Sequence, residues 1–282
     1  MTWQILLLIS VISYSISILL QRVLMKDDQN DPIAYSIVYQ LFTGILIGIY
    51  ALFNGFIVQG FIPLIPNFIL MIVLYGAGNI FVWQALKIID VSEFTIIFAS
   101  RAFWTIIGAI IFLGESLSLK QVIGIILIIF SIVLVFWKKQ KFSLNRGFVF
   151  AFLGALLWGI AFTNDFLVVN SFDVLSYLTI AFILPALAIW MIFPKSTVKM
   201  KPLLERKTLW KMGLLGILYA VSTITIFLAY QIGQNATQIA PLNQVSTIII
   251  VILSAIFLKE RTDLLRKLLG AIISFIGVFL LK

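Results

Sequence analysis

Apolar residues run along the chain in ten long stretches, and short links between them hold most of the charged residues. Each stretch is close to the length of about 20 residues that a helix needs to cross a bilayer. The stretches cover residues 2–21, 33–53, 64–86, 92–113, 119–137, 147–168, 173–193, 210–231, 236–258 and 264–281. They do not show the alternation of apolar and polar residues that is typical of membrane β-strands. The pattern predicts an all-α integral membrane protein with ten transmembrane helices.

Composition supports this prediction. Of the 282 residues, 62% are hydrophobic and 11% are charged, whereas a soluble domain has about 45–50% apolar and about 25% charged residues. The N-terminal stretch lacks the basic segment and the small-residue cleavage site of a signal peptide, so we expect it to be retained as the first helix. The lipid bilayer is therefore an expected partner of the chain.

Lysine and arginine are distributed unevenly between alternate links. If there are ten spans, seventeen of the twenty cations lie on one side of the membrane, only Lys120 and Lys282 lie on the other, and Arg101 lies within a span. Cytoplasmic links are enriched in Lys and Arg. The distribution predicts a multi-pass protein of the plasma membrane with basic links in the cytoplasm and both termini outside. A nucleic-acid partner is not expected, because the cations lie between apolar stretches rather than on one soluble face.

The two halves of the chain share a sequence landmark. IIFLGE at 110–115 matches AIFLKE at 255–260 in four positions, at an offset of 145 residues, and Gly124 and Gly270 follow these segments. Two halves of five helices must cross the membrane in opposite senses, because five is odd. The sequence therefore predicts two inverted five-helix repeats, 1–142 and 143–282, as in secondary transporters whose substrate site lies between the halves.

These features resemble the EamA-like branch of the drug/metabolite transporter superfamily. The resemblance rests on ten helices arranged as five plus five, with Gly-Glu or Lys-Glu after the fourth helix of each half and a glycine downstream. It covers essentially the whole chain and implies a single-chain transporter of small organic molecules, with a central cavity ringed by helices from both halves. The chain departs from the family at Arg101, where many members carry a proline. It departs also in the side predicted for its termini, which familiar members place in the cytoplasm.

Arg101 lies near the middle of its predicted span. A charge at the bilayer centre costs at least about 2.5–3.5 kcal/mol on insertion scales, so the side chain should face protein or a water-filled cavity. Glu93 is the nearest acid on the same helix, and eight residues exceed the i to i+4 spacing of a helical ion pair. Two interpretations stay open. The guanidinium could bind a substrate carboxylate or phosphate, or it could bind a carbonyl or carboxylate of another helix.

Other polar and aromatic residues have a similar estimated depth. They are Tyr14, Gln40, Tyr75, Asn79, Trp104, Trp158, Asn243 and Gln244. Together with Arg101 they would form a site with aromatic walls and a few polar groups, which is typical of small-molecule sites. Singly, each could instead join two helices. Pro241 is expected to break its helix and to free carbonyls near Asn243.

Two acids are candidates for proton coupling, Asp165 and Glu93. The rise of a helix places Asp165 near the outer end of its span, where a carboxylate is hydrated at little cost, so the favoured interpretation is an interfacial residue. The alternatives are proton coupling or pairing with Arg101.

Glu115 and Glu260 follow the fourth helix of each half. We expect them to be structural, either as caps of adjoining helix starts or as partners of Lys120 and Arg261.

The residue inventory excludes several function classes. The chain has no His and no Cys, so hydrolase or metal-dependent chemistry lacks its usual groups, and we expect no enzyme activity, cofactor or metal. A nucleotide-phosphate loop is absent, and so are the charged rings of a channel. We predict a secondary-active transporter, an exporter that works as a monomer. It would move a small anionic or zwitterionic organic metabolite by alternating access. The alternative on the same fold is a flippase of a phosphate-bearing lipid carrier.

Overall fold

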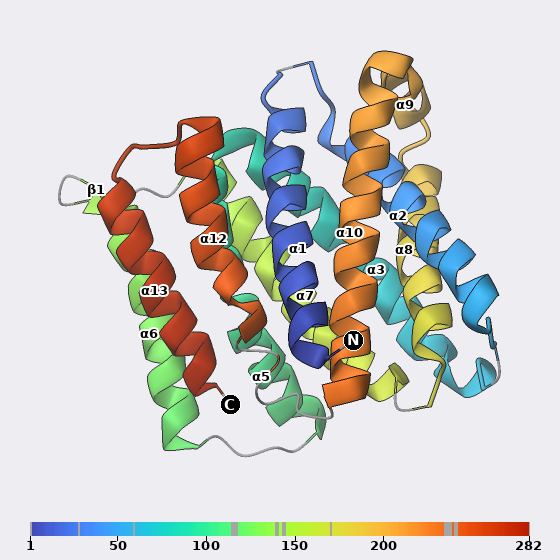
Figure 1. The fold of residues 1–282 in the computed structure, drawn as a ribbon, viewed down its shortest axis with the longest axis horizontal. Helices are drawn as coiled ribbons and strands as arrows, with labels where there is room; N and C mark the ends of the chain where they lie inside the picture. Colours follow the sequence, from blue (N-terminus) through green and yellow to red (C-terminus); the bar gives the residue numbers. More distant parts are fainter. Residues whose placement is uncertain are drawn as a thin grey trace.

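The computed structural model describes residues 2–27, 29–58, 60–113, 118–138, 141–142, 145–169, 171–233, 239 and 242–281. The described chain is a bundle of helices that run side by side (Figure 1). The helices are α1 (Trp3–Met25), α2 (Pro32–Asn54), α3 (Ile65–Ile88), α4 (Val91–Phe98), α5 (Arg101–Leu113), α6 (Leu119–Phe136), α7 (Arg146–Val169), α8 (Val174–Ile192), α9 (Ser196–Leu204), α10 (Arg206–Gly233), α12 (Val245–Leu253) and α13 (Leu264–Leu280). A 3-10 turn, η1 (Ile62–Leu64), precedes α3, and a π-helical segment, η2 (Ser254–Leu258), continues α12. Two short strands, β1 (Trp137–Lys138) and β2 (Lys141–Phe142), pair as a hairpin.

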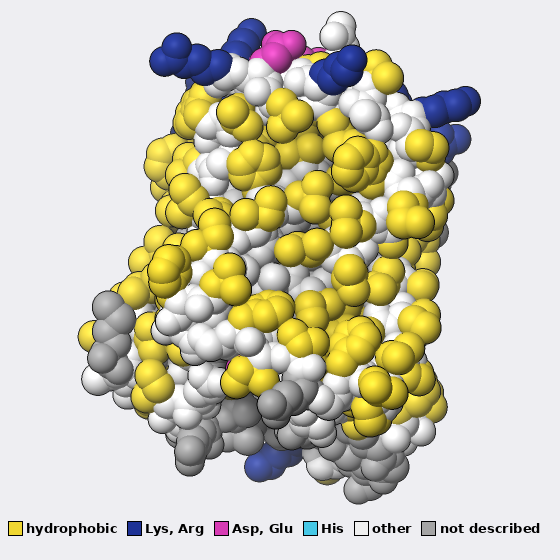
Figure 2. All heavy atoms as spheres, turned by 90° about the vertical axis from the view of Figure 1, so that its right-hand side faces the viewer, with side chains coloured by type: hydrophobic (Ala, Val, Ile, Leu, Met, Phe, Trp, Pro, Cys, Tyr) yellow, Lys and Arg dark blue, Asp and Glu magenta, His cyan; other side chains and the backbone are white. Residues whose placement is uncertain are grey.

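Eight helical segments of the described chain are long and apolar enough to cross a membrane. The apolar segment Val245–Leu258 is shorter, and α13 has 17 residues. Hydrophobic side chains cover the flank of the molecule, and most of the lysines and arginines in view lie at one end of it, with a smaller basic group at the other end (Figure 2). The prediction of a multi-pass helical membrane protein is confirmed, whereas the count of ten spans stays a prediction.

Both chain termini lie at the same end of the bundle. The link between α1 and α2 and the short helix α9 lie at the opposite end (Figure 1). The charge distribution predicts that the basic links and the termini lie on opposite sides of the membrane. A position at opposite ends of the bundle is what that prediction requires.

The predicted span 92–113 is two helices rather than one. The chain turns at Ala99 and Ser100, between α4 and α5. The Ser100 hydroxyl donates to the carbonyl oxygen of Ile97 at 2.7 Å. Ser131 makes the same bond inside the uninterrupted helix α6, so this bond accompanies the turn but does not by itself break a helix. The surrounding apolar residues hide the break in a hydropathy pattern. Arg101 thus begins a new helix.

The link between α8 and α10 contains a helix that the sequence did not predict. In α9, Met200 and Leu203 are buried, and the helix packs against α2 and α10. Two buried positions are too few to produce a recognisable apolar stretch. Two further features, Pro241 and Glu115, lie outside the described residues.

Helices from the two halves of the chain pack against each other. The most extensive contacts join α1 to α10, α3 to α7, α2 to α8, and α6 to α13. Among the largest fully buried side chains are Trp83, Tyr39 and Phe94. The Tyr39 ring contacts Trp83 of the first half and Phe182 and Tyr219 of the second. The interior is therefore shared by both halves.

Glycines allow α6 and α13 to approach closely. A Cβ atom built on Gly277 would lie 2.8 Å from the carbonyl oxygen of Gly124 and 3.1 Å from the backbone nitrogen of Ile128. Both neighbours are backbone atoms, which cannot move aside as a flexible side chain could. Close approach at small residues is a main source of attraction between membrane helices, because lipid supplies no hydrophobic drive.

We expect Gly277→Ala to lower the free energy of unfolding by about 1–3 kcal/mol, the usual cost of overpacking. Gly213→Ala is the matched control, since a Cβ on Gly213 meets no heavy atom within 4 Å. The measurement is reversible denaturation in detergent. Equal losses for the two variants would show that the α6–α13 crossing is not tight.

Candidate functional site

A cavity of about 120 Å³ lies among helices from both halves. The first half contributes Ser10, Tyr14, Tyr75, Asn79 and Arg101, and the second contributes Trp158, Phe162, Asp165, Tyr177, Leu178, Ala181, Phe182, Tyr219, Ser222, Thr223, Ile226, Phe227 and Asn243. Its wall therefore combines aromatic rings, three hydroxyl-bearing side chains from Ser and Thr, and one side chain of each charge. Aromatic walls with a few polar groups are typical of sites for small organic molecules.

Arg101 lies in this wall among aromatic rings. Its Nη1 donates to the Tyr14 hydroxyl at 3.3 Å, and its Cζ lies 4.7 Å from the ring centre of Phe98 and 5.7 Å from that of Phe162. Such rings stabilise a cation through their negative faces. Among the described residues, no carboxylate oxygen lies within 4.0 Å of the guanidinium. The charge is stabilised but not neutralised, which leaves N–H donors for an anion.

Threonines fix the helix that carries Arg101. The Thr105 hydroxyl, on α5, donates to the carbonyl oxygen of Gly159 on α7 at 3.0 Å. The Thr163 hydroxyl, on α7, donates in return to the carbonyl oxygen of Thr105 at 3.0 Å. The two helices can exchange these bonds because Gly159 has no side chain to hold them apart; a Cβ there would meet Thr105 at 3.1 Å. The position of Arg101 is therefore set by α7.

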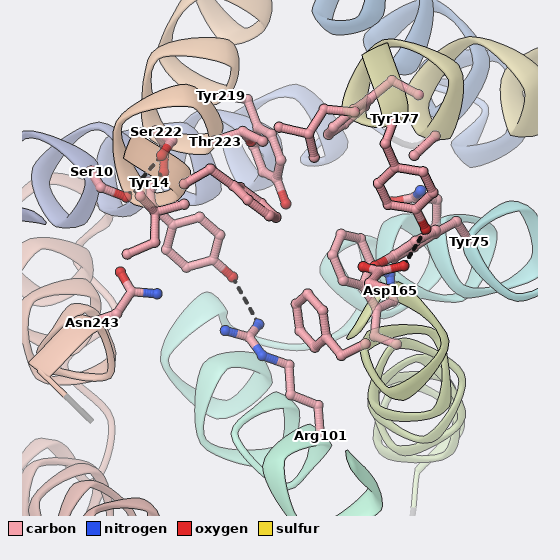
Figure 3. Close-up of a pocket in the computed structure, with 18 residues that line it drawn as sticks. Ser10, Tyr14, Tyr75, Arg101, Asp165, Tyr177, Tyr219, Ser222, Thr223 and Asn243 are labelled. Atoms are coloured by element: carbon pink, nitrogen blue, oxygen red, sulfur yellow. Dashed lines mark hydrogen bonds between the residues drawn. The ribbon is translucent and has the colours of Figure 1, made fainter. Parts of the chain in front are cut away.

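Asp165 lies on another side of the same cavity. Its two carboxylate oxygens accept hydrogen bonds from the hydroxyls of Tyr75 and Tyr177, one each. The residue is 8% exposed, so the expectation that water hydrates this carboxylate is wrong, whereas its depth in the membrane stays a prediction. Counting the rise along a helix estimates depth but takes no account of the neighbouring helices, and here α3 and α8 supply the two phenols. Asp165 forms no ion pair with Arg101, and Figure 3 shows the two on different sides.

We expect Tyr177→Phe to destabilise the protein by about 1.5–3 kcal/mol, because it removes one of two hydrogen bonds to a buried charged group. Tyr50→Phe is the control, since Tyr50 lies on the exposed face of α2. Chemical unfolding in detergent measures both. Combining Tyr177→Phe with Asp165→Asn should recover part of the loss, and full additivity would contradict the coupling of the two side chains.

Gln40 orients Asn79 from behind the cavity. Its Nε2 donates to the carbonyl oxygen of Ser36 at 3.0 Å, and its Oε1 accepts from Asn79 Nδ2 at 3.0 Å. The backbone carbonyl can only accept, so the orientation of both amides follows from it. Gln40 is fully buried and does not line the cavity, whereas Asn79 does. The carbonyl oxygen of Asn79 is the part of that side chain left for a ligand.

Three further predicted residues lie outside the cavity. Trp104 packs against Phe103 and Phe152, and Gln244 donates to the Thr247 hydroxyl at 3.1 Å. Glu93 lies 3.9 Å from the Nζ atom of Lys267. The structure thus brings together Arg101, Tyr14, Tyr75, Asn79, Trp158, Asn243 and Asp165 around one cavity. Gln40, Trp104, Gln244 and Glu93 lie outside its wall, although Gln244 lines a smaller pocket together with Tyr14 and Arg101.

Several cavity residues were not predicted from the sequence. Tyr219, Ser222, Thr223 and Ile226 lie at the spacing i, i+3, i+4, i+7 on α10. That spacing puts them on one helix face. A mainly polar face on an otherwise apolar helix could therefore have identified them as cavity residues from the sequence. Tyr177 had no such signal, because its role depends on its bond to Asp165.

A buried ionic cluster lies at the end of α1 that faces away from the termini. The Nζ atom of Lys267 is 2.7 Å from Asp90 Oδ2, and Arg22 Nε is 3.4 Å from Glu260 Oε1. Arg22 also donates to the carbonyl oxygen of Leu86 at 2.6 Å. The two ion pairs join α1 and the start of α4 to the link and helix that follow η2, and the bond to Leu86 joins α1 to α3. The ionic cluster, defined as Arg22, Asp90, Glu93, Glu260 and Lys267, therefore connects the two halves.

Glu260 bonds to the start of a helix, but this helix is α4 of the first half and not α13, which follows Glu260 in the chain. Its carboxylate accepts from the backbone nitrogen of Ser92, at the start of α4, at 3.5 Å. Burial raises its pKa, and repulsion from Asp90 adds to the rise. The predicted pairing with Arg261 is wrong, because Arg261 donates to the carbonyl oxygen of Ala255 instead. Across the described chain, no group of three or more His, Cys, Asp or Glu side chains could hold a metal ion.

Comparisons with known proteins agree with this architecture. The chain is similar to a protein of known crystal structure with a TM-score of 0.53 and 12% sequence identity, over 95% of each chain. At that identity the similarity shows the fold alone. No curated protein matches the chain. The model of the EamA-like transporter family matches twice, over residues 1–137 and 145–282. The two matches cover nearly the whole sequence, and the chain therefore belongs to the EamA-like transporter family of the drug/metabolite transporter superfamily.

Proposed function

We propose that this membrane transporter moves a compact anionic or zwitterionic metabolite through the central cavity by alternating access. The observation that carries the proposal is Arg101, a cation that faces a cavity between the halves and has no carboxylate partner among the described residues. In this proposal the chain has ten spans in two inverted halves, 1–142 and 143–282. It acts as a monomeric exporter of the plasma membrane, with basic links in the cytoplasm and termini outside.

The helix contacts support two equivalent halves. If α1, α2, α3, α5 and α6 correspond in order to α7, α8, α10, α12 and α13, exchanging the halves converts the α1–α10 contact into α7–α3. It likewise converts α1–α12 into α7–α5 and leaves α2–α8 and α6–α13 unchanged, and all these contacts are present. A cavity enclosed by such halves can open to either side when one half rocks against the other.

The cavity chemistry supports the substrate class. A guanidinium binds carboxylate or phosphate through two parallel N–H bonds. The Asn79 and Asn243 carbonyl oxygens can accept from a substrate donor, and the Asn243 oxygen is buried without a hydrogen-bond partner among the described residues. A cavity of about 120 Å³ is close to the engineered cavity of about 150 Å³ that binds benzene. This size favours a compact metabolite over the lipid carrier of the flippase alternative.

Thermal-shift screening of the purified protein against metabolite pools tests the proposal. A ligand present at a hundred times its Kd stabilises the native state by about 2.7 kcal/mol. We expect stabilisation by a carboxylate- or phosphate-bearing compound, followed by flux of that compound into proteoliposomes. A compound that binds but is not moved, or stabilisation by polyprenyl phosphates alone, would contradict the proposal.

A further inference from the structure

The link between α8 and α10 carries a dense cationic surface. The segment 195–211 contains six cations and one acid, Glu205. Five of the cations, Lys195, Lys201, Arg206, Lys207 and Lys211, have no carboxylate within 4.0 Å among the described residues. We call these five the cationic α9 surface. All but Lys211 are exposed, so these four side chains are accessible to an anion outside the protein.

The sixth cation, Lys199, has a structural partner. Its Nζ atom lies 2.6 Å from Asp31 Oδ2. Burial would raise the pKa of Asp31, but the bond to Lys199 and the N–H groups of Ala34 and Ile33 together lower it. Asp31 caps α2 through those N–H groups. Lys199 therefore ties α9 to the start of α2, and we do not count it in the cationic α9 surface.

Apolar and aromatic side chains accompany these cations. Val198 and Leu204 of α9 and Trp210 of α10 are 68%, 55% and 60% exposed. The Nζ atom of Lys211 lies 5.8 Å from the Trp210 ring centre, and Trp190 Nε1 donates to the Thr197 hydroxyl at 2.7 Å. Tryptophans and lysines in this combination are typical of the level of lipid headgroups. Figure 2 shows the same transition, with cations at the end of a hydrophobic flank.

We propose that the cationic α9 surface binds the headgroups of anionic phospholipids in the leaflet that faces it. The five cations complement lipid phosphates, while the exposed apolar side chains contact the acyl chains of the same molecules. A soluble phosphate would use only the first of these features. Clusters of Lys and Arg beside a membrane helix attract anionic lipid, and each cation contributes roughly a fivefold factor in affinity. The proposal does not depend on the identity of the transported substrate.

Lipid titration of the purified full-length chain tests the proposal. Detergent-solubilised protein is titrated with dioleoylphosphatidylglycerol or dioleoylphosphatidylcholine, and bound lipid is counted by native mass spectrometry. We expect phosphatidylglycerol to bind more tightly and to raise the thermal midpoint, and high salt to weaken this binding. Lys201→Gln/Lys207→Gln should lower the apparent affinity about thirtyfold, because it removes two cations.

The matched control is Lys259→Gln/Arg261→Gln, which removes two exposed cations beside α12 and α13, on the other flank of the bundle (Figure 1). We expect this pair to leave the affinity within about threefold of the wild type, since its cations are remote from the site. An equal loss of lipid affinity in the two double variants would overturn the proposal, because it would mean that lipid responds to the overall positive charge of the protein and not to this surface. Equal binding of the two lipids, or full competition by soluble glycerol phosphate, would also overturn it. Thermal midpoints without lipid verify that both variants fold.

Discussion

Arg101→Ala is expected to abolish transport and to weaken substrate binding by about 10- to 150-fold, the equivalent of about 1.5–3 kcal/mol for hydrogen bonds to a charged group. The stability of the variant should stay the same or rise, because the substitution removes a charge that costs at least about 2.5–3.5 kcal/mol within a bilayer. Among the described residues, its partners are one tyrosine hydroxyl and aromatic ring faces. These contacts are weak compared with an ion pair.

Measuring both flux and the thermal midpoint of Arg101→Ala distinguishes a structural role of Arg101 from a substrate-binding role. A structural role predicts a lower thermal midpoint, whereas a substrate-binding role predicts lost flux at an unchanged or higher midpoint. Arg101→Lys should retain part of the binding, because an ammonium keeps the charge but not the planar fork. Arg146→Ala, at the exposed start of α7, is the control. Normal flux by Arg101→Ala in proteoliposomes would remove Arg101 from the substrate site.

Lys267→Met is expected to lower the free energy of unfolding by up to about 3–5 kcal/mol, the cost of removing one partner from a fully buried ion pair, since the Asp90 side chain is 30% exposed. The Lys267 side chain is 1% exposed and bonds to Asp90 at 2.7 Å. Without it, Asp90 and Glu93 would face each other, with Arg22 as the remaining cation of the cluster. Methionine has a similar length to lysine, so the loss of stability measures the removal of the charge and not the creation of a cavity.

Unfolding in detergent measures this effect, with Lys259→Met at an exposed position as the control. Lys267→Met/Asp90→Asn should recover part of the stability, because it also neutralises one of the two carboxylates that Lys267 contacts. A loss below about 1 kcal/mol for Lys267→Met, equal to that of a surface pair, would mean that the ionic cluster does not hold the halves together.

Much of the fold could be predicted because the bilayer imposes simple constraints on a sequence. The apolar stretches fixed the helical class, and the repeat of IIFLGE as AIFLKE indicated two related halves. The break at Ala99 and Ser100 could not be predicted, since no glycine or proline marks it among the apolar residues. Helix α9 was missed because only its short buried face distinguishes it from a polar link.

Only those site residues whose side chains are costly to place in lipid could be identified from the sequence. Arg101 was identified because a charge within an apolar span is costly unless it has a partner or a function. Asp165 was instead expected at the outer membrane interface, because the helical rise places it near the end of its span. Its true surroundings depend on Tyr75 and Tyr177, which come from two other helices. Gln40 was expected to touch substrate and instead orients Asn79. Such distinctions require the lateral packing of helices, which no single stretch encodes.

The central claim is that the cavity opens in turn to the two sides of the membrane, and labelling with a membrane-impermeant maleimide tests it directly. The sequence contains no cysteine, so Thr223→Cys places a single thiol at the cavity wall (Figure 3). Val221→Cys, on the exposed flank of α10, is the control for reaction within lipid. Alternating access predicts that Thr223→Cys reacts from either side of oriented membranes and that the transported compound slows both reactions. Reaction from one side only, unchanged by that compound, would contradict it.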